Sequence, residues 1–166
     1  MAASFWGAAF SLEGNMRKRG FEVVSKYEGK GINIPTRHTA ASAGYDMEAA
    51  EETVLAPHRV TIVPTGLKAY MQPDEYLALH VRSGFSIKNM VSCVNDEGVI
   101  DADYYNSSAN EGHIMVALMN FGDEPVKVDK GMRIAQGIFH RYLTVDGDEA
   151  GEGEKRAGGM GSTGLK

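Results

Sequence analysis

Residues 113–140 read HIMVALMNFGDEPVKVDKGMRIAQGIFH, and the pattern of this stretch decides the fold class. Three short apolar runs, 113–120, 126–128 and 134–140, are separated by turn-forming residues. Alternation within such a run predicts a half-buried strand, because successive side chains of a strand point to opposite faces. In the first run, one face is expected to carry the side chains of Ile114, Val116, Leu118 and Asn120.

The rest of the patterned region, which begins at Phe21, repeats this arrangement. Further strands are predicted at Phe21–Val24, Thr61–Leu67 and Tyr76–Val81. Turn signals recur roughly every 8–12 residues, a spacing typical of sandwiches and barrels. No long segment has the period of an amphipathic helix, and only one or two helical turns are expected near Ser83–Met90. We therefore predict an all-β fold.

Composition limits the classes of function. The 166 residues fit one domain. The net charge of −5 argues against a nucleic-acid-binding protein, whose surface carries a surplus of clustered basic residues. We therefore expect no nucleic-acid partner. No apolar run is long enough to cross a membrane, so we expect no membrane partner either. The single cysteine, Cys93, rules out an intramolecular disulfide and indicates a reducing, cytoplasmic compartment.

Three regions of the chain differ in composition. Residues 1–15 are interpreted as a leader or an expression-derived extension, because the patterned sequence begins only after them. Residues 16–145 make up the predicted β domain. Residues 146–166 hold seven of the 20 glycines and almost no large apolar side chains, so they are predicted to form a mobile C-terminal arm.

Three polar clusters stand out where the familiar catalytic motifs are absent. They are Arg82-Ser83-Gly84, then Asp101 and Asp103 with Tyr104 and Tyr105, and finally the glycine-rich run 158–164 behind Lys155 and Arg156. Glycines beside hydroxyls and a cation suit an anion, because bare backbone N–H groups can approach a phosphate. A carboxylate at a strand end beside aromatic rings suits a general base next to a ring-binding wall. The five histidines show no metal-ligand spacing, and Cys93 is expected to be a buried, inert thiol.

The order of these clusters resembles the trimeric dUTP diphosphatase (dUTPase) family over about residues 21–166. The family's five short motifs match Ala43-Gly44-Tyr45-Asp46-Met47, Arg82-Ser83-Gly84-Phe85, Asn95-x-x-Gly98-Val99-Ile100-Asp101-Ala102-Asp103-Tyr104, Arg133-Ile134-Ala135-Gln136 and Gly159-Met160-Gly161-Ser162-Thr163-Gly164. The resemblance implies a jelly-roll-like β-barrel that forms a homotrimer with shared active sites and exchanged C-terminal arms. It also implies Mg²⁺-assisted hydrolysis of dUTP to dUMP and pyrophosphate, which keeps uracil out of DNA and supplies dUMP for thymidylate synthesis.

The resemblance assigns a role to each matching residue. Asp101 would be the general base for the water that attacks the α-phosphorus, and Tyr104 would lie against the deoxyribose and exclude a 2′-hydroxyl. Uracil would be read by Asn95 and by the main chain of Gly98, Val99 and Ile100. The phosphates would be held by Arg82, Ser83, Gly84 and Gln136. Asp46 would organise the water shell of the metal, and the triphosphate of a neighbouring subunit's site would be covered by Arg156, Gly161, Ser162 and Thr163.

The sequence departs from the family pattern at two places. The segment from Tyr105 to Glu111 is about six residues longer than usual, and Met160 replaces the arm's usual aromatic residue. Two alternatives follow for Tyr105: it covers the uracil, with Met160 contributing less, or it packs the lengthened loop or a subunit contact. The spacing also leaves open whether Lys155 or Arg156 clamps the γ-phosphate.

Two competing functions remain weaker. A dCTP deaminase shares the fold, but Arg82-Ser83-Gly84-Phe85 fits the hydrolase better. A binding or nucleotide-sensing module would be favoured by loss of Asp101 or of the arm glycines, and both are present. The sequence does not identify a regulatory protein partner, and the lengthened loop is where such a second role would reside.

Overall fold

The computed structural model describes residues 17–148. The predicted leader and the arm beyond residue 148 lie outside the described residues. The elements are β1 (Gly20–Val23), a 3₁₀ turn η1 (Ser25–Tyr27), β2 (Tyr45–Glu48), β3 (Thr53–Leu55), β4 (Val60–Pro64), β5 (Leu67–Tyr70), β6 (Glu75–Val81), α1 (Ser83–Asn89), β7 (Val91–Cys93), β8 (Gly98–Asp101), a 3₁₀ turn η2 (Ala102–Tyr104), β9 (Met115–Asn120), β10 (Val126–Val128) and β11 (Arg133–Arg141).

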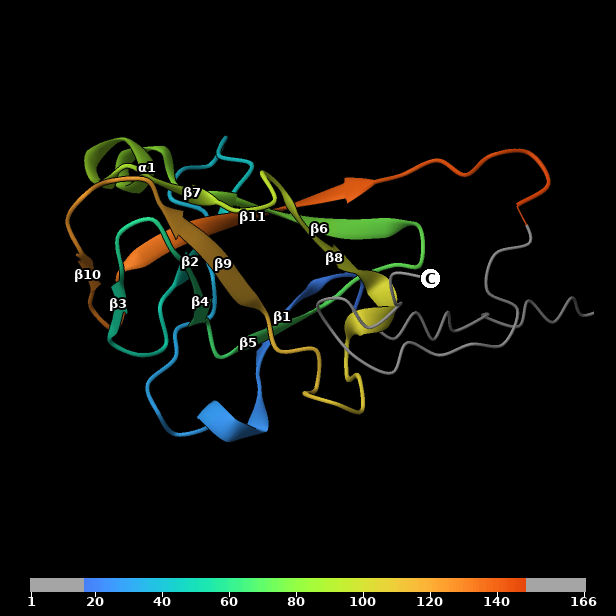
Figure 1. The fold of residues 1–166 in the computed structure, drawn as a ribbon. Coiled ribbons are helices and arrows are strands. Elements are labelled where there is room, and N and C mark those ends of the chain that lie inside the picture. Colours follow the sequence, from blue (N-terminus) through green and yellow to red (C-terminus); the bar gives the residue numbers. More distant parts are fainter. Residues whose placement is uncertain (1–16, 149–166) are drawn as a thin grey trace, which may run out of the picture.

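Four antiparallel sheets make up the fold. The largest has the strand order β2-β11-β6-β8, the next has the order β4-β9-β7, and the pairs β1-β5 and β3-β10 complete the set. Figure 1 shows the long β6 and β11 strands running across the molecule, with β9 and β4 below them in this view. In the part of the chain that the structure describes, no helix has the length and hydrophobicity needed to span a bilayer.

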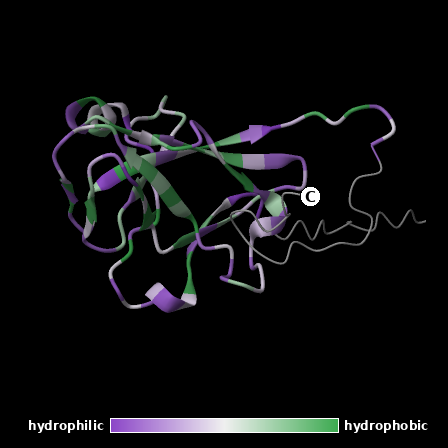
Figure 2. Cartoon of the chain, in the orientation of Figure 1, coloured by the Kyte–Doolittle hydropathy of each residue, from purple (hydrophilic) through white to green (hydrophobic). Residues whose placement is uncertain are grey.

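The core lies between the two larger sheets. Leu77 and Leu79 of β6 and Ile134 of β11 pack in one cluster with Val116 and Leu118 of β9. Figure 2 shows hydrophobic residues concentrated on the strands and hydrophilic ones on the connections. The predicted face of the 113–120 run is confirmed, because all four of its residues are buried.

Asn120 can be buried on that face because the hydrogen bonds of its side-chain amide are satisfied. Its Nδ2 donates to the carbonyl oxygens of Leu55 and Glu124, and its Oδ1 accepts from the N–H of Gly122. Cys93 is buried as well, which confirms the expected burial of this thiol. Burial raises the pKa of that thiol.

Two expectations about the strands need correction. The predicted strand Thr61–Leu67 is two strands, because β4 ends at Pro64 and β5 begins at Leu67. Gly66 adopts a φ of +72°, a left-handed conformation that favours glycine, and it interrupts the strand where Thr65 and Leu67 both bond to Ile114. The strands β2, β3, β7 and β8 were not expected from the sequence, and each is defined by its pairing with a neighbouring strand. The short helix expected near Ser83–Met90 is present as α1.

Candidate active site

A polar pocket of about 270 Å³ brings together three of the sequence motifs. It is lined by His38, Ser42, Gly44, Asp46, Arg82, Ser83, Gly84, Phe85 and Gln136. We call it the phosphate pocket. Strand register assembles it: Gln136 of β11 is paired with Asp46 of β2 on one side and with His80 of β6 on the other. Arg82 and Ser83 follow directly where β6 ends and α1 begins.

Gly44 is required by close packing inside this pocket. A Cβ at Gly44 would lie 2.3 Å from Oε1 of Gln136, which is closer than real atoms approach. A side chain there would push Gln136 out of position. The first motif therefore carries glycine at this point so that the glutamine of the fourth motif can reach the pocket. His38 and Ser42 also line it, and sequence reasoning missed both because their loop carries no recognisable motif.

Asp46 orients two arginines beside the pocket. Its Oδ1 accepts from Nε of Arg82 at 2.9 Å, and its Oδ2 lies 3.0 Å from an Nη of Arg133. The Asp46 side chain is only 16% exposed, so these charge-assisted hydrogen bonds are partly shielded from water. Two guanidinium groups around one carboxylate leave a net positive charge, which suits an anionic ligand.

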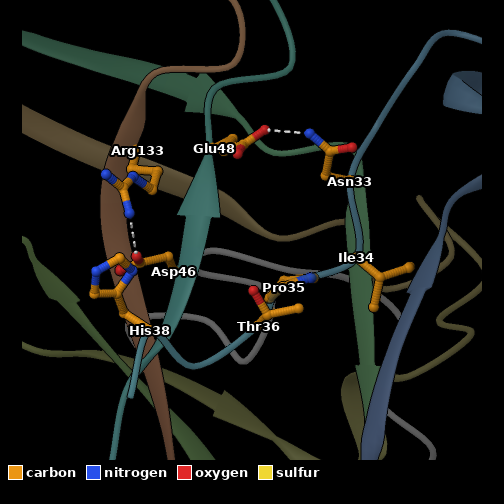
Figure 3. Close-up of a pocket in the computed structure, with 8 residues that line it drawn as sticks. All are labelled: Asn33, Ile34, Pro35, Thr36, His38, Asp46, Glu48 and Arg133. Carbon is orange, nitrogen blue, oxygen red and sulfur yellow. Dashed lines mark hydrogen bonds and ion pairs between the residues drawn. The ribbon is translucent and has the colours of Figure 1, made fainter. Parts of the chain in front are cut away.

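A second cavity of about 460 Å³ adjoins the phosphate pocket and shares Asp46 and His38 with it. Figure 3 shows its lining: β2 contributes Asp46 and Glu48, β11 contributes Arg133, and the loop 33–38 closes the opposite side. Asn33 Nδ2 donates to Glu48 Oε2 at 2.9 Å and ties that loop to β2. The lining is polar on both sides, with one cation and two carboxylates.

The predicted base and sugar-binding residues form a separate group around β8. Asp101 is the last residue of β8 and is directly paired with Tyr76 of β6. Tyr104 lies in η2 and is 6% exposed. Gly98, at the other end of β8, is paired with Leu79, and a Cβ there would lie 3.1 Å from the Leu79 Cβ. This strand and the turn before it carry the residues expected to read uracil.

Asp101 and the phosphate pocket lie at opposite ends of β6, whereas Gly98 is paired with Leu79 nearer the pocket end; Figure 1 shows β8 alongside β6. Asp101 is paired with Tyr76, whereas Arg82 follows Val81 at the other end of the strand. Six residues of extended chain span about 20 Å. One chain therefore does not bring Asp101 together with the phosphate pocket. Arg156, Met160, Gly161, Ser162 and Thr163 of the arm lie outside the described residues.

Comparisons with known proteins show the family to which the chain belongs. A family model described as dUTPase matches residues 30–164. The chain belongs to the dUTPase family. It is thus a nucleotide hydrolase, and the predicted all-β, jelly-roll-like fold is confirmed.

Individual members of the dUTPase family are similar to this chain over most of their own length. Deoxyuridine 5'-triphosphate nucleotidohydrolase of Lactococcus lactis is 53% identical, with 90% of this chain and all of the relative covered. The enzyme of the same name from Brucella melitensis is 37% identical over 86% of this chain and 92% of its own length. The crystal structure of dUTPase from Streptococcus mutans superposes with a TM-score of 0.74 at 43% identity, covering 77% of this chain and 99% of the other.

In this dUTPase-family chain, the contacts of Tyr105 favour the second of its two alternatives. Its hydroxyl donates to Oε2 of Glu22 at 2.6 Å, and its ring meets the edge of Tyr70 at a centroid distance of 5.9 Å. The Lys68 ammonium lies 5.4 Å from the ring centroid. These contacts anchor the lengthened loop to β1 and β5 rather than present the ring to a base.

Tyr105→Phe is therefore expected to lower the free energy of unfolding at neutral pH, and this loss should shrink on acidification. The Tyr105 hydroxyl, with help from Arg17, holds the pKa of Glu22 below its ordinary value of 4.5. The bond thus stabilises the fold above that pH and is lost as pH falls through the lowered pKa. We expect a loss of about 1–2 kcal/mol in the free energy of unfolding at neutral pH, the lower part of the range for a bond to a charged group. Urea unfolding at neutral pH and at about pH 3.5 measures it.

Tyr142→Phe is the matched control for this prediction. The Tyr142 hydroxyl donates to the carbonyl oxygen of Pro73 at 2.8 Å, on an exposed part of the surface. Its loss should cost less and should not depend on pH in the acid range, because no carboxylate is involved. A destabilisation by Tyr105→Phe that stayed constant on acidification would contradict the role given to Glu22.

Proposed function

We propose that the chain hydrolyses dUTP to dUMP and pyrophosphate in a homotrimer, with each active site shared between subunits. The observation that carries this proposal is the separation of Asp101 from the phosphate pocket along β6. A base must lie within hydrogen-bonding reach of the attacking water at the α-phosphorus, so the two halves of a site come from different chains. Directly paired residues share a face, and alternation along β6 places Asp101, Gln136 and Asp46 on the same face of the large sheet.

The phosphate pocket holds the triphosphate. Arg82 supplies a planar set of donors, while Ser83, Gly84 and Gln136 add a hydroxyl, backbone and amide contacts. Asp46 keeps the guanidinium of Arg82 aimed at the pocket through the 2.9 Å bond. Catalysis of phosphoryl transfer depends mostly on positioning and on electrostatic stabilisation, and this set supplies both.

Asp101 is the general base of the reaction. It removes a proton from a water molecule whose oxygen forms a bond to the α-phosphorus of dUTP. The bond from that phosphorus to the bridging oxygen breaks, and pyrophosphate leaves with the bond's electron pair. Asp101 stands at the end of β8, where the ladder with β6 fixes its backbone.

The residues present suit Mg²⁺ bound mainly through phosphate oxygens and water. Among residues 17–148, no group of three or more His, Cys, Asp or Glu side chains is arranged to hold a metal ion. Mg²⁺ commonly keeps several waters and is bound by few carboxylates when it accompanies a nucleotide. Asp46, with both oxygens engaged by arginines, would act on that water shell indirectly. When bound, the ion neutralises charge on the phosphates.

The β8 group recognises the nucleoside. The ring of Tyr104 forms the wall against the deoxyribose and leaves no room for a 2′-hydroxyl. Uracil is read by Asn95 and by main-chain groups of Gly98, Val99 and Ile100. From the arm, Met160 covers the base, and the triphosphate is closed over by Arg156, Gly161, Ser162 and Thr163.

Self-association has support from an exposed apolar sheet face. Val60 and Ile62 of β4 point outward and are paired with Met119 and Ala117 of β9. Val94 continues the same face beyond β7, where its N–H donates to the carbonyl of Ala117. An exposed stripe of this kind marks an interface, and a second and third copy of the chain would bury it.

Complementation between two inactive variants tests the shared site. Asp101→Asn and Arg82→Ala are each expected to be almost inactive, and Asp46 keeps Arg133 as a partner in the second variant. Unfolding an equimolar mixture and refolding it should restore activity, because random assortment gives about a quarter of the sites both wild-type groups. The refolded protein should have three times the 18.0 kDa mass of the chain.

The controls are each variant refolded alone and the two variants mixed without unfolding, and all should stay inactive. If both residues served the same site from one chain, every site would keep one defect and mixing would restore nothing. Failure of the wild-type protein to release pyrophosphate from dUTP would instead contradict the reaction itself.

A further inference from the structure

The hydroxyl of Tyr104 is held from two sides. It donates to the carbonyl oxygen of His113 at 3.1 Å and accepts from Nδ2 of Asn110 at 2.8 Å. The side chain is 6% exposed, so water has little access to these bonds. A buried hydroxyl with one donor and one acceptor partner has a fixed orientation, and the ring that carries it is fixed as well.

Asn110 is itself oriented by the lengthened loop. Its Oδ1 accepts from Oγ of Ser107 at 3.0 Å and from the N–H of Gly112 at 3.1 Å. The backbone N–H of Gly112 can only donate and so must face the amide oxygen, which turns the NH₂ group toward Tyr104. Gly112 has a φ of +76°, and a Cβ there would lie 2.3 Å from the carbonyl oxygen of Tyr104. The loop is thus packed directly against the backbone of the residue that it supports.

Lys68 ties this loop to the body of the domain. Its ammonium donates to Oδ1 of Asn106 at 2.7 Å and to Oε2 of Glu111 at 3.3 Å, and its side chain is 12% exposed. The same carboxylate oxygen of Glu111 accepts from the N–H of Ser25 at 3.2 Å. Asn106 and Glu111, on either side of Asn110, are therefore both attached to β5, and Glu111 is also attached to the start of η1, so the segment that carries Asn110 is held at both ends.

We propose that Asn110 is a positioning residue that sets the selectivity for deoxyribonucleotides through the Tyr104 hydroxyl. The inference rests on the proposed function, in which the Tyr104 ring excludes a 2′-hydroxyl. A wall discriminates against one extra oxygen only while it stays within a fraction of an ångström of its place. Without the Asn110 donor, the ring is held by the His113 carbonyl alone and can tilt away from the sugar.

An asparagine suits this position because its side chain must donate a hydrogen bond to the Tyr104 hydroxyl and accept hydrogen bonds from Ser107 and Gly112. An aspartate has the same shape but, when ionised, only accepts. The Tyr104 hydroxyl has one hydrogen, so either the carboxylate oxygen that faces it or the carbonyl of His113 would lose its donor. Asn110→Asp is therefore a near-isosteric probe of the donor, and Asn110→Ala removes the side chain.

The test compares kcat/KM for dUTP and for UTP in the full-length protein. Both Asn110 variants are expected to lower the ratio of dUTP to UTP efficiency by about tenfold, the size of one lost hydrogen bond. Ser108→Ala is the matched control, since Ser108 is exposed in the same loop and should leave the ratio unchanged. Trimer mass and melting temperature are followed for each variant, and Asn110→Asp carries the test if Asn110→Ala fails to fold.

A double-mutant cycle separates this role from a general loosening of the loop. In a Tyr104→Phe background the hydroxyl is absent, so adding Asn110→Ala should change the ratio by less than about twofold. A tenfold change in that background would overturn the inference, because Asn110 would then act by another route. Wild-type selectivity in both single Asn110 variants would also overturn it. If the wild-type protein does not hydrolyse dUTP at all, the proposed function fails and this inference fails with it.

Discussion

Asp101→Asn is expected to lower kcat for dUTP by a factor of about 10²–10⁴, which corresponds to roughly 3–5 kcal/mol. The amide keeps the size of the side chain and much of its hydrogen bonding, but it cannot take the proton of the attacking water. KM should change little, because the phosphate and uracil contacts are made by other residues. Initial rates of pyrophosphate release and the affinity for dUTP measure the two effects separately.

Asp103→Asn is the control for Asp101→Asn. Asp103 lies two residues after Asp101, in the 3₁₀ turn η2, and is exposed, so its amide variant should keep most of the activity. Retention of more than about a tenth of wild-type kcat by Asp101→Asn would contradict the assignment of the general base.

Truncation after Val145 is expected to leave a folded trimer with hydrolysis reduced by at least an order of magnitude. Figure 1 shows the chain after β11 running away from the body, and residues 142–148 are all exposed. The truncation removes residues 146–148 of this exposed segment and a stretch that has almost no large apolar side chains in its sequence, so the melting temperature should hardly change. Catalysis should fall because the site loses the groups proposed to close over the triphosphate and exclude water.

A shorter truncation after Arg156 locates the effect within the arm. It keeps the acidic segment and both basic residues but removes the glycine-rich end with Met160, Ser162 and Thr163. An equal loss in both truncated forms would assign closure to the glycine-rich end. Near-normal kcat/KM in the protein that ends at Val145 would show that the arm has no part in catalysis.

The sequence alone determined the fold class and the family. Alternation in residues 113–120 placed Ile114, Val116 and Leu118 in the core, because the side-chain period of a strand is a local property of the chain. Residue type and spacing also indicated an anion-binding role for Arg82-Ser83-Gly84 and the glycine-rich run 158–164, and a general-base role for Asp101. Three motifs far apart in the chain then proved to meet in one pocket.

Only the tertiary structure decided how those residues are paired. Asp46 and Arg133 are 87 residues apart, and the Asn110 donor to Tyr104 belongs to a loop that matches no motif. Strand register brings such residues together, and register depends on which strands become neighbours rather than on the pattern within one strand. Because β8 pairs along β6 with Asp101 opposite Tyr76, the proposed general base lies at the far end of the strand from Arg82. That pairing, which no single segment encodes, separates Asp101 from the phosphate pocket within one chain and is the basis of the proposal that subunits share active sites.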